Sequence, residues 1–183
     1  MWEAGIDEES VRQINEYAST LEEQVALTGD VSGGGGVADI RRSKIRWLPI
    51  RKEGTTKILN MISAIFTEGN NNAFGVIWEG INDIQHTLYE AEDKGHYGFH
   101  HDVFLDAPVM KHRKLSMSIQ LSDKNSYEGG DLIVYYGGEQ YIAPKSKGTV
   151  FVFDSRLTHE VTPITSGERY SLVKWFHGDD TLR

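Results

Sequence analysis

Hydrophobic residues recur at intervals of three and four in two N-terminal segments, a spacing that is typical of amphipathic helices. The first segment follows Asp7, a residue type that commonly caps helix N-termini. Its apolar stripe consists of Val11, Ile14, Ala18, Leu21 and Val25. Glu and Gln occupy the opposite face, so the pattern predicts a surface helix that packs its stripe on a core.

The second helical segment is predicted to start at Thr55 or Thr56, either of which could act as the cap. Its apolar positions are Ile58, Leu59, Ile62, Ile65 and Phe66. The pattern stops at the Gly69–Asn72 break. Between the two helices, Gly29–Asp39 contains four consecutive glycines and is predicted to be a loop. The following RRSKIRWLPI is predicted to be a strand that ends at Pro49.

From Ala73 onward the pattern changes to short strands separated by Gly, Pro, Asn and Asp. In KLSMSIQL the apolar residues alternate, which places Leu115, Met117, Ile119 and Leu121 on one face. The glycine pair Gly137-Gly138 indicates a hairpin. Thr149–Phe153 is apolar enough for a strand buried on both faces, and Arg169–Phe176 is predicted to be a further strand.

Two helices followed by seven or eight strands favour a mainly β, α+β fold, with helices packed on an antiparallel sandwich or jelly roll. The length suits one domain over residues 1–183. We expect a helical support over about residues 1–72 and a strand core over about residues 73–178.

Composition narrows the functional classes. The chain has no cysteine, which excludes disulfides, thiolate zinc sites and a cysteine nucleophile. There are 27 acidic and 19 basic residues, a balance that argues against a nucleic-acid backbone as partner. Neither a signal peptide nor a bilayer-length apolar run is present, so we expect a soluble, cytoplasmic protein with no membrane partner. The oligomeric state cannot be predicted.

Candidate chemistry begins in GHYGFHHDVF. His100 and Asp102 are separated by one residue, so on a strand both side chains point the same way, while His101 points oppositely. Two such ligands and a third from a neighbouring strand can hold iron on one face and leave adjacent positions open. The spacing alone is weakly specific, because His177 and Asp179 repeat it near the C-terminus, where nothing downstream completes a site.

A second motif, HEVTPITSGERYSLVKW, supplies a third ligand in His159 at the start of a strand. Arg169 comes ten residues later and is followed by Ser171. Alternation places these two residues on one face and Lys174 on the other. A guanidinium beside a hydroxyl can clamp a carboxylate, because the arginine fork matches carboxylate geometry. Trp47 and Trp175 are expected in the core, and Trp175, which shares the face of Arg169, is also a candidate for the wall of the same pocket.

Together, the His-x-Asp pair, the distal histidine and the Arg-x-Ser pair resemble the Fe(II)/2-oxoglutarate dioxygenases. Within that superfamily the chain is most similar to the prolyl 4-hydroxylase-like branch of bacterial and viral type, and SYEGGDLIVY adds to the likeness. The resemblance covers roughly residues 42–178 and is strongest after Tyr89. It implies a double-stranded β-helix, or jelly-roll, core.

The resemblance also implies residue roles. His100, Asp102 and His159 correspond to the metal ligands, Arg169 to the residue that pairs with 2-oxoglutarate, and Ser171 to its helper. An upstream tyrosine often assists, and either Tyr89, the preferred candidate, or Tyr97 could do so. Relatives often have Trp where this chain has Phe99, a change that should leave ligation intact. Animal prolyl 4-hydroxylases use lysine where this chain has Arg169.

The implied activity is hydroxylation of a C–H bond with Fe(II), 2-oxoglutarate and O₂, releasing succinate and CO₂, with ascorbate as a reductant. Peptidyl proline is the leading substrate, and a free amino acid, another protein side chain or a modified base remain open. Alternatives from other classes are a non-enzymatic jelly-roll binding module and a zinc- or manganese-dependent cupin-like enzyme. The ligand types fit several metals, so the native metal also remains open.

Overall fold

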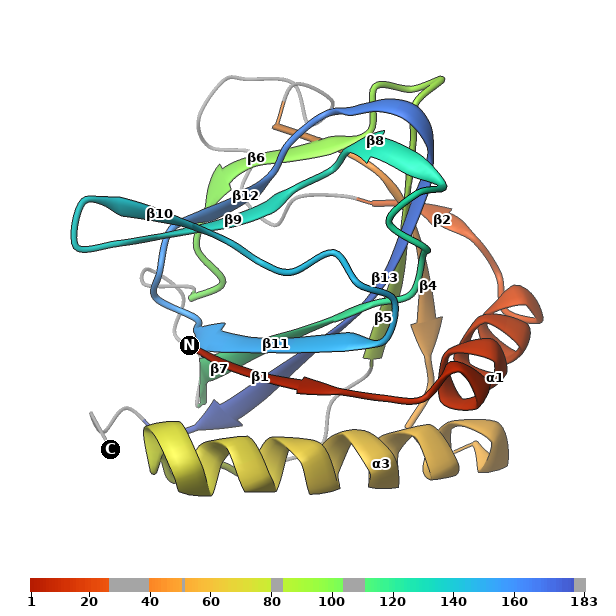
Figure 1. Ribbon diagram of the computed structural model, residues 1–183. Helices are drawn as coiled ribbons and strands as arrows, with labels where there is room; N and C mark the ends of the chain where they lie inside the picture. The colour runs from red at the N-terminus through yellow and green to blue at the C-terminus, as the bar shows by residue number, and fades with distance from the viewer. Residues whose placement is uncertain (27–39, 51, 80–83, 104–110, 180–183) are drawn as a thin grey trace.

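Two antiparallel β-sheets face each other, and two helices cover the outer side of the larger sheet (Figure 1). This arrangement comes from a computed structural model, which describes residues 1–26, 40–50, 52–79, 84–103 and 111–179. The mainly β, jelly-roll type of fold that the sequence predicts is therefore confirmed. The predicted Gly29–Asp39 loop lies outside the described residues.

The larger sheet follows the order β1 (Trp2–Gly5), β11 (Thr149–Asp154), β7 (His112–Gln120), β13 (Ile164–Gly178), β5 (Ile84–Glu90), β4 (Lys44–Leu48), β2 (Gln24–Val25). In addition, β8 (Tyr127–Gly129) pairs with β13 outside that order. The smaller sheet follows the order β10 (Glu139–Ile142), β9 (Leu132–Tyr136), β12 (His159–Val161), β6 (His96–His100), β3 (Arg41–Arg42). The strand β13 is central because it pairs with β5 on one side and β7 on the other.

The helix α1 (Glu8–Ser19) begins where its apolar stripe predicts, because the Asp7 carboxylate accepts a hydrogen bond from the Ser10 N–H at 2.7 Å. The longer helix α3 (Glu53–Gly69) continues into a short π-helix, η1 (Asn70–Phe74). The first hydrophobic core joins the apolar faces of both helices to the larger sheet. Its largest fully buried side chains include Ile14, Ile62, Phe66, Leu115, Met117, Ile119 and Phe176.

The second core lies between the two sheets. Its buried members are Tyr89, Tyr127, Leu132, Val134, Ala143, Phe151, Phe153, Val161 and Ile164. Since Phe151 and Phe153 face this core while Val150 and Val152 face the helices, β11 is buried on both sides as predicted. The second core closes one part of the space between the sheets and leaves the rest for a cavity.

The N-terminal part differs from the predicted helical support, because it also contains four short strands. Alternation missed β1, which pairs with β11 through contacts about 150 residues apart in the chain. The stripe of the first helix ends early: Val25 lies in β2 and is 73% exposed. RRSKIRWLPI forms two strands instead of one, since β3 joins the smaller sheet and β4 the larger.

Two further predictions need correction. The helix α3 starts before Thr55, and Thr55 is buried, donating a hydrogen bond to the Tyr17 hydroxyl at 3.1 Å instead of capping the helix. Trp47, expected in the core, is 37% exposed. The Gly137-Gly138 hairpin is confirmed, because both glycines have positive φ between β9 and β10. Among the helices described, none is long and apolar enough to cross a bilayer.

Candidate metal centre

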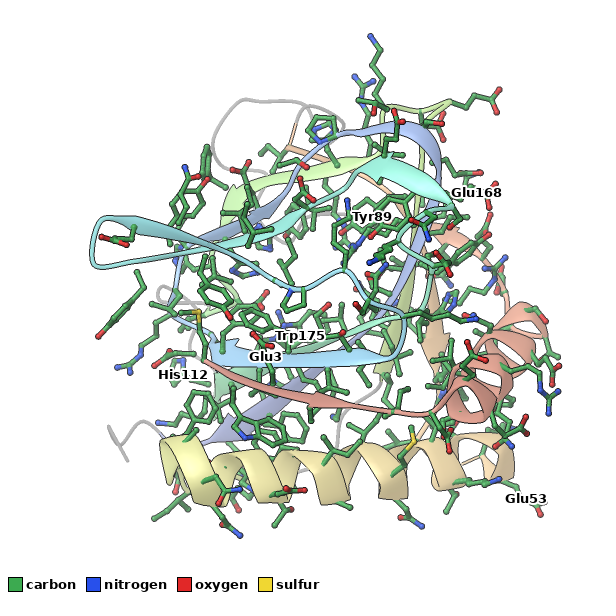
Figure 2. All side chains as sticks on the ribbon, viewed as in Figure 1. Glu3, Glu53, Tyr89, His112, Glu168 and Trp175 are labelled. Atoms are coloured by element: carbon green, nitrogen blue, oxygen red, sulfur yellow. The ribbon has the colours of Figure 1, made fainter. Side chains whose placement is uncertain are left out.

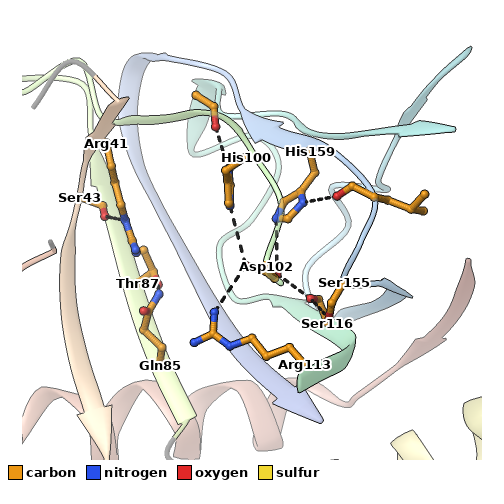
Figure 3. Close-up of polar contacts among 12 residues, drawn as sticks. Arg41, Ser43, Gln85, Thr87, His100, Asp102, Arg113, Ser116, Ser155 and His159 are labelled. Atoms are coloured by element: carbon orange, nitrogen blue, oxygen red, sulfur yellow. Dashed lines mark hydrogen bonds and ion pairs between the residues drawn. The ribbon is translucent and has the colours of Figure 1, made fainter. Parts of the chain in front are cut away.

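Three potential ligands converge at the inner face of the smaller sheet. His100 ends β6 and His159 begins the neighbouring β12, where the two residues are register partners. Asp102 follows two residues after His100 and is held by a hydrogen bond from its N–H to the Ser155 carbonyl at 2.9 Å. The candidate ligand atoms of these three residues all lie within 4.8 Å of one another. Figure 3 shows the three side chains pointing toward one space.

Both imidazoles are oriented for coordination through Nε2. His100 Nδ1 lies 2.8 Å from the Gly98 carbonyl, and His159 Nδ1 lies 2.9 Å from the Leu157 carbonyl. A carbonyl can only accept, so Nδ1 carries the proton in both rings and the Nε2 lone pair is available to a metal. His100 Nε2 lies 4.0 Å from Asp102 Oδ1, and His159 Nε2 lies 3.5 Å from Asp102 Oδ2.

Protonation favours the same role. Burial lowers the pKa of His100 to about 3, and the neighbouring His159 adds to the shift, so the ring is neutral. Burial alone would raise the pKa of Asp102, but His159, His100, the Ser116 hydroxyl and Arg113 outweigh it and lower the pKa. The site thus offers two imidazole Nε2 atoms and one carboxylate, a donor set that suits a divalent iron ion.

The Asp102 carboxylate is also held from behind. The Ser116 hydroxyl donates a hydrogen bond to Asp102 Oδ2 at 2.5 Å and lies 2.8 Å from the Ser155 hydroxyl. Arg113 Nη1 lies 3.8 Å from Asp102 Oδ1, which is longer than a hydrogen bond. Such contacts fix the direction of a ligand and hold its lone pairs toward the metal.

A cavity of about 280 Å³ opens beside the triad, between the two sheets. Arg169 and Ser171 line it from β13, together with Tyr89 and Trp175, which lie in the interior (Figure 2). Arg169 is 4% exposed, and its Nε donates to Gln120 Oε1 at 3.1 Å. In the part of the chain that the structure describes, this is its one hydrogen bond, so its outer N–H groups are available to a ligand.

Two tyrosines were candidates, and both line the cavity. Tyr89 is the register partner of Arg169, whose guanidinium carbon lies 5.7 Å from the centre of the Tyr89 ring. Tyr97 instead stacks on His100, with 3.5 Å between the ring centres. Tyr89 therefore lies beside Arg169, and Tyr97 lies beside the candidate ligand His100.

Other histidines behave differently from the triad. The second His-x-Asp pair, at His177, is not part of a metal-binding cluster within the described residues. His86 is 2% exposed and forms a hydrogen bond with Asn15 through Nε2 at 3.0 Å. It joins β5 to α1, on the side of the sheet away from the cavity.

Sequence reasoning missed several polar residues at the cavity. Arg41, Arg113, Ser116 and Ser118 line it, and Gln120 lies behind Arg169 as its hydrogen-bond partner. The signal for two of them was present in β7, where Ser116 and Gln120 alternate with the apolar residues of a strand that lies inside the sheet. A polar face on such a strand indicates a cavity, since buried polar groups need partners.

Comparisons with known proteins agree with this geometry. A family model described as the 2OG-Fe(II) oxygenase superfamily matches residues 84–177. A PKHD-type hydroxylase of Alteromonas mediterranea is 34% identical over 84 residues, which are 43% of this chain. That match spans 37% of the relative, so the chain covers little more than a third of its length.

Solved structures share the fold over nearly the whole chain. The crystal structure of a Pseudomonas putida prolyl-4-hydroxylase superposes with a TM-score of 0.73 at 22% identity, covering 97% of this chain and 92% of that one. A prolyl hydroxylase from Trichoplax adhaerens, in complex with a hypoxia inducible factor oxygen degradation domain peptide fragment, superposes with a TM-score of 0.69 at 19% identity. That match covers 95% of this chain and 82% of the neighbour.

Proposed function

Because the chain belongs to the 2OG-Fe(II) oxygenase superfamily, we propose that it is an Fe(II)- and 2-oxoglutarate-dependent hydroxylase of peptide substrates, with peptidyl proline as the residue modified. The observation that carries this proposal is the shared cavity, which joins the His100, Asp102 and His159 cluster to the buried guanidinium of Arg169. A non-enzymatic binding module would need neither the ligand set nor a buried arginine beside it.

His100 Nε2, His159 Nε2 and an Asp102 oxygen would hold the ferrous ion. When bound, the ion together with 2-oxoglutarate and O₂ supplies the oxidising chemistry, which releases succinate and CO₂ and leaves a hydroxyl group on the substrate. The protein residues fix the ligand directions, because each Nδ1–H is bound to a carbonyl and Asp102 to Ser116.

Arg169 would bind the distal carboxylate of 2-oxoglutarate. Gln120 occupies its Nε and thereby orients the fork, so that the two terminal nitrogens can pair with both carboxylate oxygens. Ser171, also in the cavity wall, would add a hydroxyl donor, and Tyr89 would lie against the bound molecule beside Arg169. Because Arg169 is buried, little water competes for its N–H groups, and its interaction with the carboxylate would be stronger than at the protein surface.

The proposed substrate is based on the similarity to prolyl hydroxylase structures and on the aromatic residues at the cavity. The Trichoplax neighbour is a prolyl hydroxylase bound to a peptide fragment, and the Pseudomonas neighbour is a prolyl-4-hydroxylase. The rim of the cavity carries Trp47, which is partly exposed and lies 6.4 Å from Trp175 between ring centres. Aromatic walls of this kind suit a pyrrolidine ring. Free amino acids, other side chains and modified bases are the alternatives that the test must separate.

The test is succinate formation by purified protein supplied with Fe(II), 2-oxoglutarate, O₂ and ascorbate, with and without a proline-rich peptide. We expect metal-dependent turnover that the peptide stimulates and that His159→Ala abolishes. Turnover that survives in His159→Ala would contradict the ligand assignment. Absence of both turnover and Fe(II)-dependent binding of 2-oxoglutarate would favour a binding module. Activity with Zn(II) or Mn(II) in place of Fe(II) would show that the native metal is not iron.

Arg169→Leu tests the clamp separately. We expect the KM for 2-oxoglutarate to rise roughly tenfold or more, because a charge-assisted hydrogen bond contributes about 1.5–3 kcal/mol. Arg169→Lys keeps the charge but loses the fork and should recover part of the affinity. An unchanged KM in a folded Arg169→Leu protein would assign the carboxylate to another residue.

A further inference from the structure

The cavity concentrates positive charge in a protein that is acidic overall. The chain has a net charge of −8, yet the cavity is lined by Arg41, Arg113 and Arg169. Within the described ranges, Asp102 is the one carboxylate in its wall. Three guanidinium groups beside one carboxylate give an excess of positive charge in a space with low access to water, where electrostatic interactions are strong.

The proposed function accounts for one of these arginines. Arg169 would pair with 2-oxoglutarate, and a ferrous ion and the 2-oxoglutarate dianion carry equal and opposite charges. Loading the site with both therefore leaves the charge excess as it was. Neither Arg41 nor Arg113 would contact the metal or the co-substrate, although Arg113 lies 3.8 Å from the Asp102 carboxylate.

Arg41 comes from β3 of the smaller sheet and is 8% exposed. Its Nε donates to the neutral Ser43 hydroxyl at 2.8 Å, and its guanidinium carbon lies 4.6 Å from the centre of the Tyr97 ring. Tyr97 in turn stacks on His100. In the regions that the structure describes, no carboxylate lies within ion-pair distance of Arg41. Burying an arginine without a carboxylate partner is costly, and a charged ligand would offset that cost.

Arg113 comes from β7 of the larger sheet and approaches the same space beside Asp102 (Figure 3). Its guanidinium carbon lies 3.8 Å from the centre of the Trp175 ring, a stacking contact that fixes the plane of the fork. Arg41 and Arg113 therefore reach the cavity from different sheets. Arg113 lies directly beside the candidate ligand Asp102, and the Tyr97 ring separates Arg41 from His100. A group that binds both would lie next to the reacting centre.

We propose that Arg41 and Arg113 form a second anion site, which binds a carboxylate that the substrate carries next to the C–H bond to be hydroxylated. This inference rests on the proposed function and specifies its substrate class. The carboxylate could belong to an acidic residue beside the modified proline or to the α-carboxylate of a C-terminal proline, for which L-proline serves as the simplest probe. Both sources present the same planar anion to the guanidinium forks.

Binding to catalytically silent protein tests the site without turnover. The protein is loaded with Zn(II) and 2-oxoglutarate, and affinity is measured by calorimetry for two matched pairs: blocked Gly-Asp-Pro-Gly against Gly-Asn-Pro-Gly, and L-proline against L-prolinamide. In at least one pair, we expect the carboxylate member to bind about tenfold more tightly, the size of one charge-assisted hydrogen bond. The pair that shows the preference identifies the source of the carboxylate.

Arg41→Gln should reduce that preference to less than about threefold, and Arg113→Gln should do the same where the Zn(II) affinity is retained. Arg42→Gln is the matched control, because it removes the same charge from the adjacent residue of β3, which is exposed and outside the cavity wall. Equal affinity within both pairs, or a preference that survives Arg41→Gln, would overturn the second anion site. Metal-dependent succinate formation by the wild type does not depend on the second anion site. Its absence would contradict the proposed function, whereas loss of the binding preference would contradict only the anion site.

Discussion

At the scale of single residues, the Asp102 side chain illustrates how a weak sequence motif gains a definite geometry. One of its oxygens accepts the short hydrogen bond from Ser116, and the backbone of Asp102 is bound to Ser155. These contacts act on the proposed ligand but do not touch the metal or substrate themselves. Ser116 is thus a positioning residue, and its effect should appear in metal affinity before it appears in turnover.

Ser116→Ala should weaken metal binding about 10–100-fold, the usual cost of removing such an outer contact. Calorimetric titration with Zn(II) measures it directly, since no catalysis is required. Ser118→Ala is the matched control, because Ser118 lies two residues along the same strand, also lines the cavity and has no hydrogen bond to Asp102. Equal affinities in the two variants would show that Ser116 does not position the ligand.

His86 is the residue whose protonation should affect stability. Burial lowers its pKa to about 4, and Arg46 adds to the shift, whereas an unfolded histidine titrates near 6.5. The folded state therefore binds its proton less readily than the unfolded state. The contribution of neutral His86 to the free energy of unfolding is fully present above pH 6.5 and declines as the pH falls toward 4.

Between pH 7.5 and pH 5, His86 should cost roughly 2 kcal/mol of unfolding free energy, since one pKa unit corresponds to about 1.36 kcal/mol. Urea unfolding of the wild type and His86→Gln at both pH values isolates this share, because His100 and His177 also have lowered pKa values. His101→Gln, at an exposed position, serves as the control and should keep the wild-type profile. A His86→Gln profile parallel to the wild type would contradict the assignment.

At the scale of elements, strand alternation predicted much of the fold and part of the site. The alternation of β7 and the face shared by Arg169 and Ser171 follow from a period of two residues, which the chain encodes locally. Tyr97 does not follow that rule. Strict alternation would point Tyr97 away from His100, but both line the cavity and stack on each other.

The reason is an irregularity in β6. His100 pairs with His159 and Tyr97 with Val161, so three steps along β6 correspond to two along β12. Such a bulge turns the Tyr97 side chain to the same face of the strand as His100. It depends on the partner strand about 60 residues away, as do β1 and the separation of β3 from β4, so none of them can be derived from local periodicity. For the same reason the sequence did not predict that Arg41 and Arg113 line the same cavity.

The turn before β9 also leaves space for the Arg169 side chain. Gly130 has a φ of +62°, and a Cβ there would lie 2.3 Å from Ile164 Cδ1 and 3.0 Å from Arg169 Cδ. The missing side chain therefore leaves room for the arginine proposed to bind 2-oxoglutarate.

Gly130→Ala should destabilise the fold by about 1–2 kcal/mol, the cost of a left-handed residue with a side chain, and should weaken 2-oxoglutarate binding several-fold. Gly137→Ala is the control, since Gly137 has a φ of +64° but no atom within 4 Å of the added Cβ. Denaturant unfolding should detect a loss of stability in both variants, and the loss should be larger in Gly130→Ala because its Cβ also meets Ile164. If calorimetry finds the same 2-oxoglutarate affinity in both, Gly130 does not determine the position of Arg169.

At the scale of the whole molecule, the site draws on both sheets. His100 and His159 belong to the smaller sheet, whereas Ser116, Arg169 and Tyr89 belong to the larger one. The second core joins the sheets at one side of the cavity, and the cavity itself leaves the other side without packing. Ligands in this space would therefore connect the sheets where side chains do not.

Metal and co-substrate should consequently raise the melting temperature together. At 100 times its dissociation constant, a ligand adds about 2.7 kcal/mol to the folded state. For a chain of this size that corresponds to an increase of roughly 5–10 °C for each ligand. Differential scanning fluorimetry with Zn(II), with 2-oxoglutarate and with both measures the increments.

We expect His159→Ala to lose the increment due to the metal and Arg169→Leu to lose only the increment due to 2-oxoglutarate. Since the co-substrate would bridge from the metal to Arg169, its increment in the wild type should be larger with Zn(II) than without it. Equal increments with and without the metal would mean that the two ligands bind independently and that the cavity does not connect the sheets through them.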